Sequence, residues 1–206
     1  MNKIYIIGAG PGNCEYILPI AYKYAEKCDV LIGAKRNLEA FVCDKKTIEL
    51  GKNLNEIIDY LKKNKDKEQI GVVVSGDTGF YSLLSFIKKH FNADELEVIC
   101  GISSISYFFS KLCKTYDDYL LISLHGKPIE VLTDAIKLNK KIVMLTDNKN
   151  NPKKIADFLI HNGYSNAKMI IGCNLSYDDE RIIYTDVNKL ETWDSENLCV
   201  VVIEIV

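Results

Sequence analysis

Residues 72–81 read Val-Val-Val-Ser-Gly-Asp-Thr-Gly-Phe-Tyr. The three valines form a short apolar run, which is typical of a parallel strand buried on both faces. The run stops at a loop with two glycines, and apolar residues at helical spacing follow. Open α/β folds bind their ligands at loops that leave the carboxyl ends of parallel strands. The stretch therefore predicts an α/β fold and marks the loop after Val74 as a candidate binding loop.

This loop has two interpretations. Gly76 and Gly79 can let the backbone approach a ligand or adopt positive φ, and the carboxylate of Asp77 can bind a ligand hydroxyl or amine. Alternatively, the glycines only form a strand-to-helix turn, with Asp77 as its cap. The loop by itself does not decide between them.

A second strand and glycine loop open the chain. Residues 3–7 are expected to form a strand, followed by Gly-Ala-Gly-Pro-Gly-Asn at 8–13 and a helix over 15–27. The dinucleotide fingerprint would need a third glycine or an alanine in place of Asn13. Pro11 also removes a backbone donor that a pyrophosphate would use. These departures disfavour dinucleotide binding.

Composition is that of an ordinary globular protein. The chain has 206 residues, of which 48% are hydrophobic and 26% charged, with a net charge of −2. The near-neutral charge disfavours a general nucleic-acid binder. Apolar runs are too short to span a membrane, and the first strand begins too early to leave room for a signal peptide. We expect a cytoplasmic protein without a membrane partner.

Seven cysteines are spread along the chain without a C-x-x-C pair, and the three histidines lie far from any zinc-like spacing. We expect no metal site, and we expect most of the cysteines to be core or near-core residues in a reducing compartment.

Arginine is rare in this chain. Of the 26 basic residues, only Arg36 and Arg181 are arginines. A guanidinium group binds carboxylates through a planar fork that lysine cannot copy, so these two residues are candidates for specific contacts. Chance is the alternative explanation.

Strand and helix patterns alternate along the first half of the chain, which predicts a parallel sheet with right-handed crossovers. In the second half the last strands follow one another with little helix between them, which predicts a mixed sheet with antiparallel pairs. Strands are expected near 3–7, 29–32, 70–75, 96–99, 119–123, 141–145, 167–171, 181–184 and 198–205. Helices are expected near 15–27, 54–64, 80–90, 103–112, 128–138 and 152–161.

A polar stretch at 114–118 is the predicted domain boundary, because it follows a helix and precedes a new strand. It separates an N-terminal α/β domain, residues 1–114, with a mostly parallel sheet from a C-terminal α/β domain, residues 118–206, with a mixed sheet. We expect a cleft between two compact domains.

Further strand ends carry polar groups. Ser103 and Ser104 follow a glycine turn, where they can hold a carboxylate at a helix N-terminus or simply cap the helix. His125 and Lys127 lie on a glycine turn after another strand. A lone histidine is more often structural, but this position makes His125 a candidate functional residue.

Taken in order, these motifs resemble the tetrapyrrole (corrin/porphyrin) methylase family. The motifs are GAGPG at 8–12, SGDTGFY at 75–81, GISS at 101–104, SLHGK at 123–127, NL at 174–175 and ERI at 180–182. The set covers nearly the whole chain and is more specific than any single loop. His-Gly-Lys and Glu-Arg-Ile point to the branch that methylates C5 of cobalt-precorrin-7 in cobalamin (vitamin B12) biosynthesis.

The resemblance implies the class III methyltransferase architecture, in which two α/β domains bind S-adenosylmethionine in the cleft between them, usually as a homodimer. Longer relatives fuse a second domain that methylates C15 and decarboxylates the ring. A chain of 206 residues leaves no room for it, so we expect the C5 reaction alone, with a separate C15 enzyme. By motif, the cofactor contacts are Pro11, Gly76, Asp77, Phe80, Ser103, Ser104, Leu145 and Leu175.

Three positions depart from the family pattern. Thr78 and Cys100 stand where proline is usual, which can loosen the two cofactor loops without changing their hydrogen-bond donors. Lys127 replaces the usual arginine and cannot make the bidentate carboxylate contact of a guanidinium group.

The remaining roles follow from the substrate that the resemblance implies. A precorrin carries many carboxylates, so Arg36, Lys127 and Arg181 are expected to bind it, and His125 is the candidate base for the departing proton. The alternatives are a methylase acting at another ring carbon, a nucleotide-dependent oxidoreductase and a non-catalytic tetrapyrrole carrier.

Overall fold

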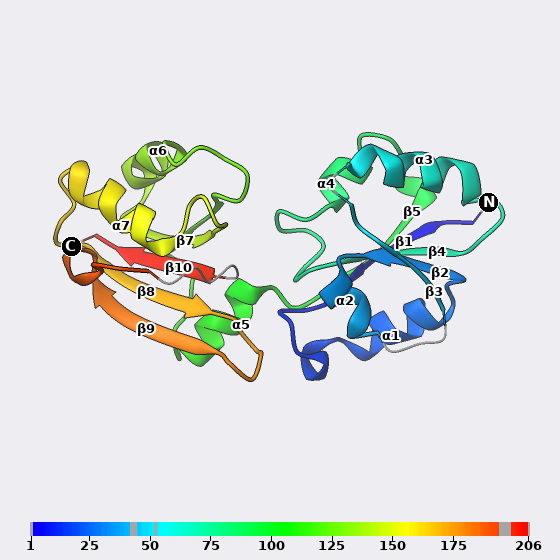
Figure 1. Ribbon diagram of the computed structural model, residues 1–206, viewed down its shortest axis with the longest axis horizontal. Helices are drawn as coiled ribbons and strands as arrows, with labels where there is room; N and C mark the ends of the chain where they lie inside the picture. Colours follow the sequence, from blue (N-terminus) through cyan, green and yellow to red (C-terminus); the bar gives the residue numbers. More distant parts are fainter. Residues whose placement is uncertain (1, 42–44, 52, 194–198, 206) are drawn as a thin grey trace. The chain divides into compact units, whose positions relative to one another are not determined.

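The computed structural model describes residues 2–41, 45–51, 53–193 and 199–205. The chain divides into two compact units, Met1–Ser104 and Ile105–Val206, each with its own five-stranded sheet (Figure 1). The predicted α/β class is confirmed. The division lies directly after Ser104, the first residue of helix α5 (Ser104–Lys111), earlier than the polar stretch at 114–118. Helix α5 belongs with the second sheet because Gly172 leaves room for it: a Cβ there would lie 2.7 Å from the ring of Phe108.

The sheet of the first unit is parallel throughout, in the order β3-β2-β4-β1-β5. Its central strand β4 carries the valine run and is buried along its whole length, as predicted. The strands are β1 (Ile4–Gly8), β2 (Val30–Gly33), β3 (Lys46–Glu49), β4 (Ile70–Val74) and β5 (Leu96–Ile99).

Helices cover both faces of this sheet, which explains why β4 reads as a continuous apolar run. Val72 and Val74 pack into the cluster under α3 (Leu54–Asn64) and α4 (Leu84–Ile87). Val73 points the other way, into the cluster under α1 (Pro19–Glu26) and α2 (Lys35–Glu39). Figure 1 shows the two helix layers on opposite sides of the strands.

The strand order creates a topological switch point. Strand β1 leads through α1 toward β2, whereas its neighbour β4 leads through α4 toward β5, in the opposite direction across the sheet. At such a point the two outgoing loops diverge to opposite faces, and open α/β sheets bind ligands there. The carboxyl ends of β1 and β4 are therefore the expected binding edge of the first unit.

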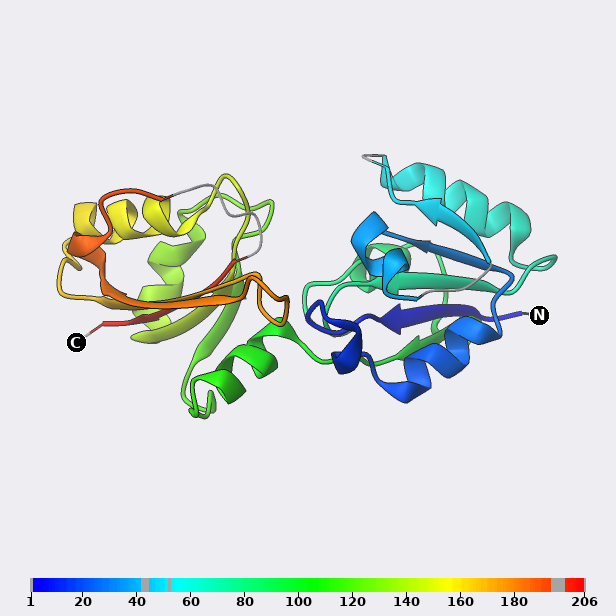
Figure 2. The same ribbon diagram turned by 60° about the horizontal axis from the view of Figure 1, so that its bottom comes forward.

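The sheet of the second unit is mixed, in the order β6-β7-β10-β8-β9, which confirms the prediction of antiparallel pairs. Among its described strands, only β6 and β7 pair in parallel. The strands are β6 (Leu120–Ser123), β7 (Lys141–Leu145), β8 (Lys168–Cys173), β9 (Arg181–Asp186) and β10 (Cys199–Glu204). Helices α6 (Val131–Leu138) and α7 (Pro152–His161) cover one face, and α5 packs on the other (Figure 2).

Two predicted helices are shorter than expected. The pattern over 15–27 splits into a 3-10 turn, η1 (Cys14–Tyr16), and α1, because Pro19 fixes the helix start. The pattern over 80–90 gives only α4, which cannot start at residue 80 because Tyr81 takes a φ of +50° that no helix allows. Helix α2 was not predicted at all.

The expectation that most cysteines are core or near-core residues is only half right. Cys28, Cys173 and Cys199 are buried, whereas Cys14, Cys100 and Cys113 are exposed. The seventh, Cys43, lies outside the described residues. Cys14 lies in η1, Cys100 follows β5, and Cys113 lies two residues beyond α5. Among the described helices, none is long and apolar enough to cross a membrane.

Candidate active site

Three loops meet through their backbones at the switch point. Gly76 donates its N–H to the carbonyl of Gly10 over 2.8 Å, and Gly10 returns a bond over 3.3 Å. Both residues have positive φ, +70° for Gly10 and +67° for Gly76. A Cβ on Gly101, after β5, would lie 2.2 Å from the carbonyl oxygen of Gly76. The loops after β1, β4 and β5 can therefore be this close only because glycine stands at the contacts.

Asp77 ties two of these loops together. Its Oδ1 accepts the N–H of Gly79 over 2.8 Å, which is the turn cap that one interpretation of the loop predicted. Its Oδ2 accepts the N–H of Gly101 over 3.4 Å. Each carboxylate oxygen has two lone pairs, so Asp77 retains acceptor capacity for a ligand while it shapes the loop.

Ser103 and Ser104 face the same loop. The Cβ direction of Gly76 points at the Cα of Ser103 and the N of Ser104, at 3.9 and 4.0 Å. Both serines are half-buried at the start of α5. The space beside Gly76 is thus bounded by the serines that the motif predicted to contact the cofactor.

The other residues predicted for this loop set lie on the same edge. Pro11 is half-buried between the glycines of the β1 loop. The ring of Phe80 packs edge-on against Tyr81, with the ring centroids 4.7 Å apart, and Tyr81 is 50% exposed. Thr78, where the family pattern has proline, is buried, and its carbonyl accepts the hydroxyl of Ser82. The loop that holds Thr78 is therefore packed against the protein.

Sequence reasoning missed the contribution of α2. The amide of Asn37, only 8% exposed, donates to Oγ of Ser75 over 2.9 Å, and that hydroxyl donates back to Asn37 Oδ1 over 3.2 Å. Arg36 donates through Nη2 to the same oxygen over 3.4 Å. Arg36 therefore lies beside the candidate binding loop of its own unit. The sequence signal that could have indicated this contribution was the Arg36-Asn37 pair, which follows shortly after the end of β2.

In the second unit, two side chains from the β7 loop hold the turn of His125 and Lys127. Asp147 accepts the N–H of Gly126 at Oδ2 over 2.7 Å. The buried amide of Asn150, 2% exposed, donates to the carbonyls of Leu124 and Lys127 over 2.8 and 2.9 Å. We call Asp147 and Asn150 the turn clamp. Within it His125 and Lys127 are both exposed.

The clamp is itself well ordered by hydrogen bonds. Oδ1 of Asp147 accepts the N–H groups of Asn150 and Lys149 over 2.7 and 2.9 Å. Burial disfavours the charged carboxylate, but the bonds from Gly126, Asn150 and Lys149, with His125 nearby, outweigh it and lower the pKa of Asp147. The carboxylate is thus held ionised where it anchors the turn.

The register of the second sheet gathers the remaining predicted residues at one edge. Leu145 ends β7 opposite Val200, and Cys173 pairs with Arg181 on one side and Cys199 on the other. Leu175 follows β8, is buried, and comes directly after Asn174, whose φ is +46°. Arg181 begins β9 at this same edge. The carboxyl ends of β6, β7 and β8 therefore bring His125, Leu145 and Leu175 to one side of the sheet.

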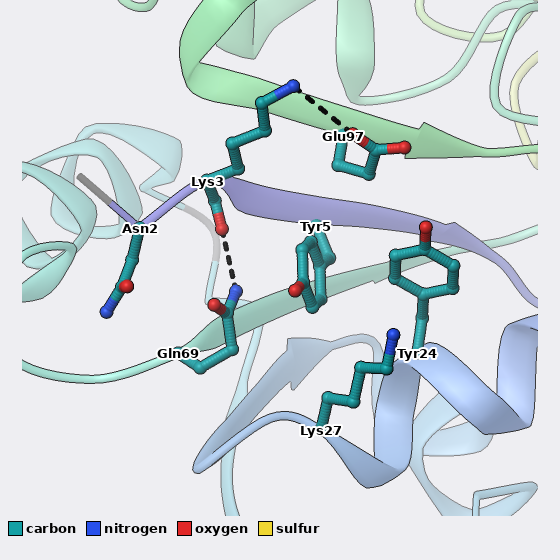
Figure 3. A pocket seen from close by; sticks show the side chains of 7 residues that line it. All are labelled: Asn2, Lys3, Tyr5, Tyr24, Lys27, Gln69 and Glu97. Atoms are coloured by element: carbon teal, nitrogen blue, oxygen red, sulfur yellow. Dashed lines mark hydrogen bonds and ion pairs between the residues drawn. The ribbon is translucent and has the colours of Figure 1, made fainter.

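A polar pocket of about 300 Å³ lies at the opposite edge of the first sheet (Figure 3). Lys3 is paired with Glu97 over 3.3 Å, and Lys27 lies 4.6 Å above the ring of Tyr24. This polar pocket contains none of the predicted site residues. Its lining residues are Asn2, Lys3, Tyr5, Tyr24, Lys27, Gln69 and Glu97. Residues 2–41, 45–51, 53–193 and 199–205 contain no cluster of three or more His, Cys, Asp or Glu side chains that could hold a metal ion.

Comparison with models of protein families shows to which family the chain belongs. The model of the Tetrapyrrole (Corrin/Porphyrin) Methylases matches residues 3–191. The chain belongs to this family. The resemblance drawn from the glycine loops is thereby confirmed, and a tetrapyrrole methylase replaces the oxidoreductase alternative.

Two similar proteins are named for the same reaction. A probable cobalt-precorrin-7 C(5)-methyltransferase of Methanocaldococcus jannaschii is 37% identical over 98% of this chain and 97% of that protein. The cobalt-precorrin-7 C(5)-methyltransferase of Salmonella typhimurium is 28% identical over 97% of this chain and 98% of that protein. This tetrapyrrole methylase is therefore similar to both relatives along nearly its whole length.

Solved structures support the same fold. Precorrin-6Y methylase of Archaeoglobus fulgidus matches with a TM-score of 0.77, at 18% identity over 99% of this chain and 98% of that chain. Uroporphyrin-III C-methyltransferase of Thermus thermophilus, solved with S-adenosylhomocysteine, matches with a TM-score of 0.76, at 17% identity over 98% of this chain and 97% of that chain. The tetrapyrrole methylase architecture is thus confirmed.

Proposed function

We propose that this tetrapyrrole methylase uses S-adenosylmethionine to methylate C5 of cobalt-precorrin-7 in cobalamin biosynthesis. The observation that carries the proposal is 37% identity, over nearly the full length of both chains, to a probable C5-methyltransferase. The His-Gly-Lys and Glu-Arg-Ile motifs, which resemble the same branch, also support it.

The loops at the switch point fit S-adenosylmethionine. Gly76 presents backbone without a side chain, and the half-buried carboxylate of Asp77 has lone pairs that can accept hydrogen bonds from a hydroxyl or an amine. When bound, the cofactor supplies a methyl group activated by a sulfonium. We assign its contacts to Pro11, Gly76, Asp77, Phe80, Ser103 and Ser104 in the first unit and to Leu145 and Leu175 in the second.

With an activated methyl donor, the main task of the protein is to orient donor and acceptor, which can contribute about 7–11 kcal/mol. We assign the substrate carboxylates to Arg36, Lys127 and Arg181. Arg36 is fixed through Ser75 beside the binding loop, and Lys127 lies on the clamped turn. His125, exposed on that turn, accepts the proton that leaves the macrocycle.

The proposal also covers the cellular location, the oligomeric state and the enzyme that acts at C15. The enzyme acts in the cytoplasm as a homodimer, and a separate enzyme carries out methylation at C15 with decarboxylation. A related Sinorhizobium protein is a precorrin-6Y C(5,15)-methyltransferase [decarboxylating], and this chain matches 27% of its length. The relatives that match over nearly their whole length are named for the C5 reaction alone, which supports a separate enzyme for C15.

The test is the position of the new methyl group. Cobalt-precorrin-7 is incubated with the enzyme and S-adenosylmethionine labelled with carbon-13 at its methyl, and the product is analysed by mass spectrometry and NMR. We expect one labelled methyl, on C5. Label on another ring carbon would contradict the proposed specificity, and binding of the corrinoid without label transfer would indicate a carrier.

A further inference from the structure

Two buried thiols face each other across the second sheet. Cys173 ends β8, Cys199 begins β10, and the antiparallel register places them directly opposite. Their Sγ atoms are 3.4 Å apart. Cys173 is fully buried and Cys199 is 5% exposed. Neither residue belongs to the motifs assigned to cofactor or substrate.

The backbone already has the spacing that a disulfide needs. Directly opposite residues of antiparallel strands have Cα atoms about 4.5–5.5 Å apart. Disulfides span Cα distances of about 4.4–6.8 Å, with the sulfurs about 2.05 Å apart. The two Sγ atoms can therefore close from 3.4 Å to bonding distance through side-chain rotation while the strands keep their pairing.

Of the two thiols, Cys199 is the one that ionises more readily. Arg181 pairs with Cys173 on the other side of β8, so its charge lies near both sulfurs. The hydrogen bond with Cys173 lowers the pKa of Cys199 and Arg181 adds to this, against the opposing effect of burial. A thiolate is the form of cysteine that reacts with oxidants.

We propose that Cys173 and Cys199 form a reversible disulfide when the protein meets a small peroxide. The Cys199 thiolate attacks one oxygen of hydrogen peroxide, the O–O bond breaks, and after proton transfer the products are a sulfenic acid and water. The Cys173 sulfur then attacks the sulfenic sulfur, displacing hydroxide, which leaves as water with the thiol proton. In total two thiols and one peroxide give one disulfide and two waters.

The disulfide would join β8 to β10 at the edge of the second sheet where the candidate site residues lie. Thr146, directly after β7, donates its hydroxyl to the carbonyl of Cys199 over 2.8 Å. Leu175 is two residues beyond Cys173. Closing the chain between the two cysteines restricts the unfolded state and so stabilises this unit. We therefore expect a higher unfolding temperature for the oxidised protein, reversed by dithiothreitol.

The experiment treats the reduced full-length chain with one equivalent of hydrogen peroxide and quenches it with an alkylating agent. After alkylation under denaturing conditions, we expect the oxidised chain to carry two alkyl groups fewer than the reduced control. Non-reducing peptide mapping should show the peptides of Cys173 and Cys199 joined to each other, and dithiothreitol should separate them. This result comes from the wild-type protein, so it does not depend on any variant folding.

Cysteine variants test whether Cys173 and Cys199 are the two residues that oxidise. A background with serine at positions 14, 43, 100 and 113 keeps only Cys28, Cys173 and Cys199, and we expect it to form the same bond. Adding Cys173→Ala should abolish both the crosslink and the peroxide-dependent rise in unfolding temperature. The proposal is wrong if wild-type Cys173 and Cys199 remain alkylatable after peroxide while the exposed cysteines oxidise, or if mapping joins either of them to another cysteine.

Discussion

At the scale of single residues, two glycines of the site are required for different reasons. Gly76 needs its positive φ of +67°, while the space for a Cβ is open, with the nearest atom 3.9 Å away. Gly101 needs the absence of a Cβ, which would lie 2.2 Å from the carbonyl oxygen of Gly76. Left-handed backbone costs an ordinary residue about 1–2 kcal/mol, whereas a 2.2 Å contact with backbone forces the loops apart.

The first prediction compares these glycines. Gly76→Val should fold with a modestly lower unfolding temperature and lose most of its affinity for S-adenosylhomocysteine, because the bulky side chain occupies the space beside Ser103. Gly101→Ala should destabilise the protein more strongly. Gly51→Val is the matched control, since nothing lies within 4 Å of its Cβ direction. Calorimetric titration that finds wild-type affinity in Gly76→Val would remove Gly76 from the cofactor site.

Arg36 is the second residue to test. Arg36→Lys keeps the charge but loses the guanidinium fork and its contact with Ser75. One charge-assisted hydrogen bond contributes about 1.5–3 kcal/mol, so we expect KM for the precorrin to rise about 10- to 100-fold with little change in kcat. The unfolding temperature should stay constant because the side chain is exposed. Lys35→Arg, at the neighbouring exposed position, is the control, and an unchanged KM in Arg36→Lys would argue for chance retention of arginine.

His125 can now be separated from the turn that carries it. Its backbone N–H, not its imidazole, donates to Oγ of Ser123 over 3.2 Å, and the clamp holds the rest of the turn. His125→Ala should therefore keep the fold and the affinity for S-adenosylhomocysteine. Loss of a general base should lower single-turnover methylation about 10²–10⁴-fold. His161→Ala, an exposed histidine on α7, is the control, and wild-type turnover by folded His125→Ala would exclude the catalytic role.

At the scale of elements, the link between the loops after β6 and β7 depends on one buried amide. Asn150→Ala removes its hydrogen bonds to the carbonyls of Leu124 and Lys127, at about 0.5–1.5 kcal/mol each, while the Leu124 carbonyl keeps its bond from the N–H of Lys127. A chain of this size should lose about 2–4 °C in unfolding temperature per kcal/mol. Turnover should fall further than stability explains, with cofactor affinity retained, because His125 and Lys127 lose their fixed turn.

Asn148→Ala is the matched control for this substitution, because Asn148 lies in the same loop and is exposed. It should match wild type in unfolding temperature and turnover. If folded Asn150→Ala shows the same turnover per molecule as Asn148→Ala, the clamp contributes to stability alone.

At the scale of the whole molecule, ligand binding should raise stability by mass action. A ligand at 100 times its dissociation constant, binding only the folded state, stabilises by about 2.7 kcal/mol. S-adenosylhomocysteine should therefore raise the unfolding temperature by several degrees, as measured by differential scanning calorimetry. NADH should cause no shift, because the loop after β1 has Pro11 and Asn13 in the dinucleotide positions. A shift with NADH and none with S-adenosylhomocysteine would overturn the cofactor assignment.

The local sequence pattern was sufficient to predict much of the secondary structure of this protein. The valine run of β4, the strand at 96–99 and the helices at 54–64 and 152–161 lie where hydrophobic periodicity and turn residues placed them. The valine run is strongly apolar and the two helices are long, so their own residues determine their structure. The order of glycine loops also indicated the family, because backbone close to a ligand restricts residue type whatever surrounds it.

The tertiary structure decided what depends on residues far apart in the chain. Helix α5 joins the second unit because of Gly172, and the backbone contact of Gly8 with Gly101 depends on the strand order. The partnership of Asn150 with the His125 turn spans two loops, and that of Cys173 with Cys199 depends on antiparallel register. Such contacts leave no periodic signal because neither partner constrains its own neighbours. Sequence alone determined most of the elements and the family, and folding determined which loops and side chains meet.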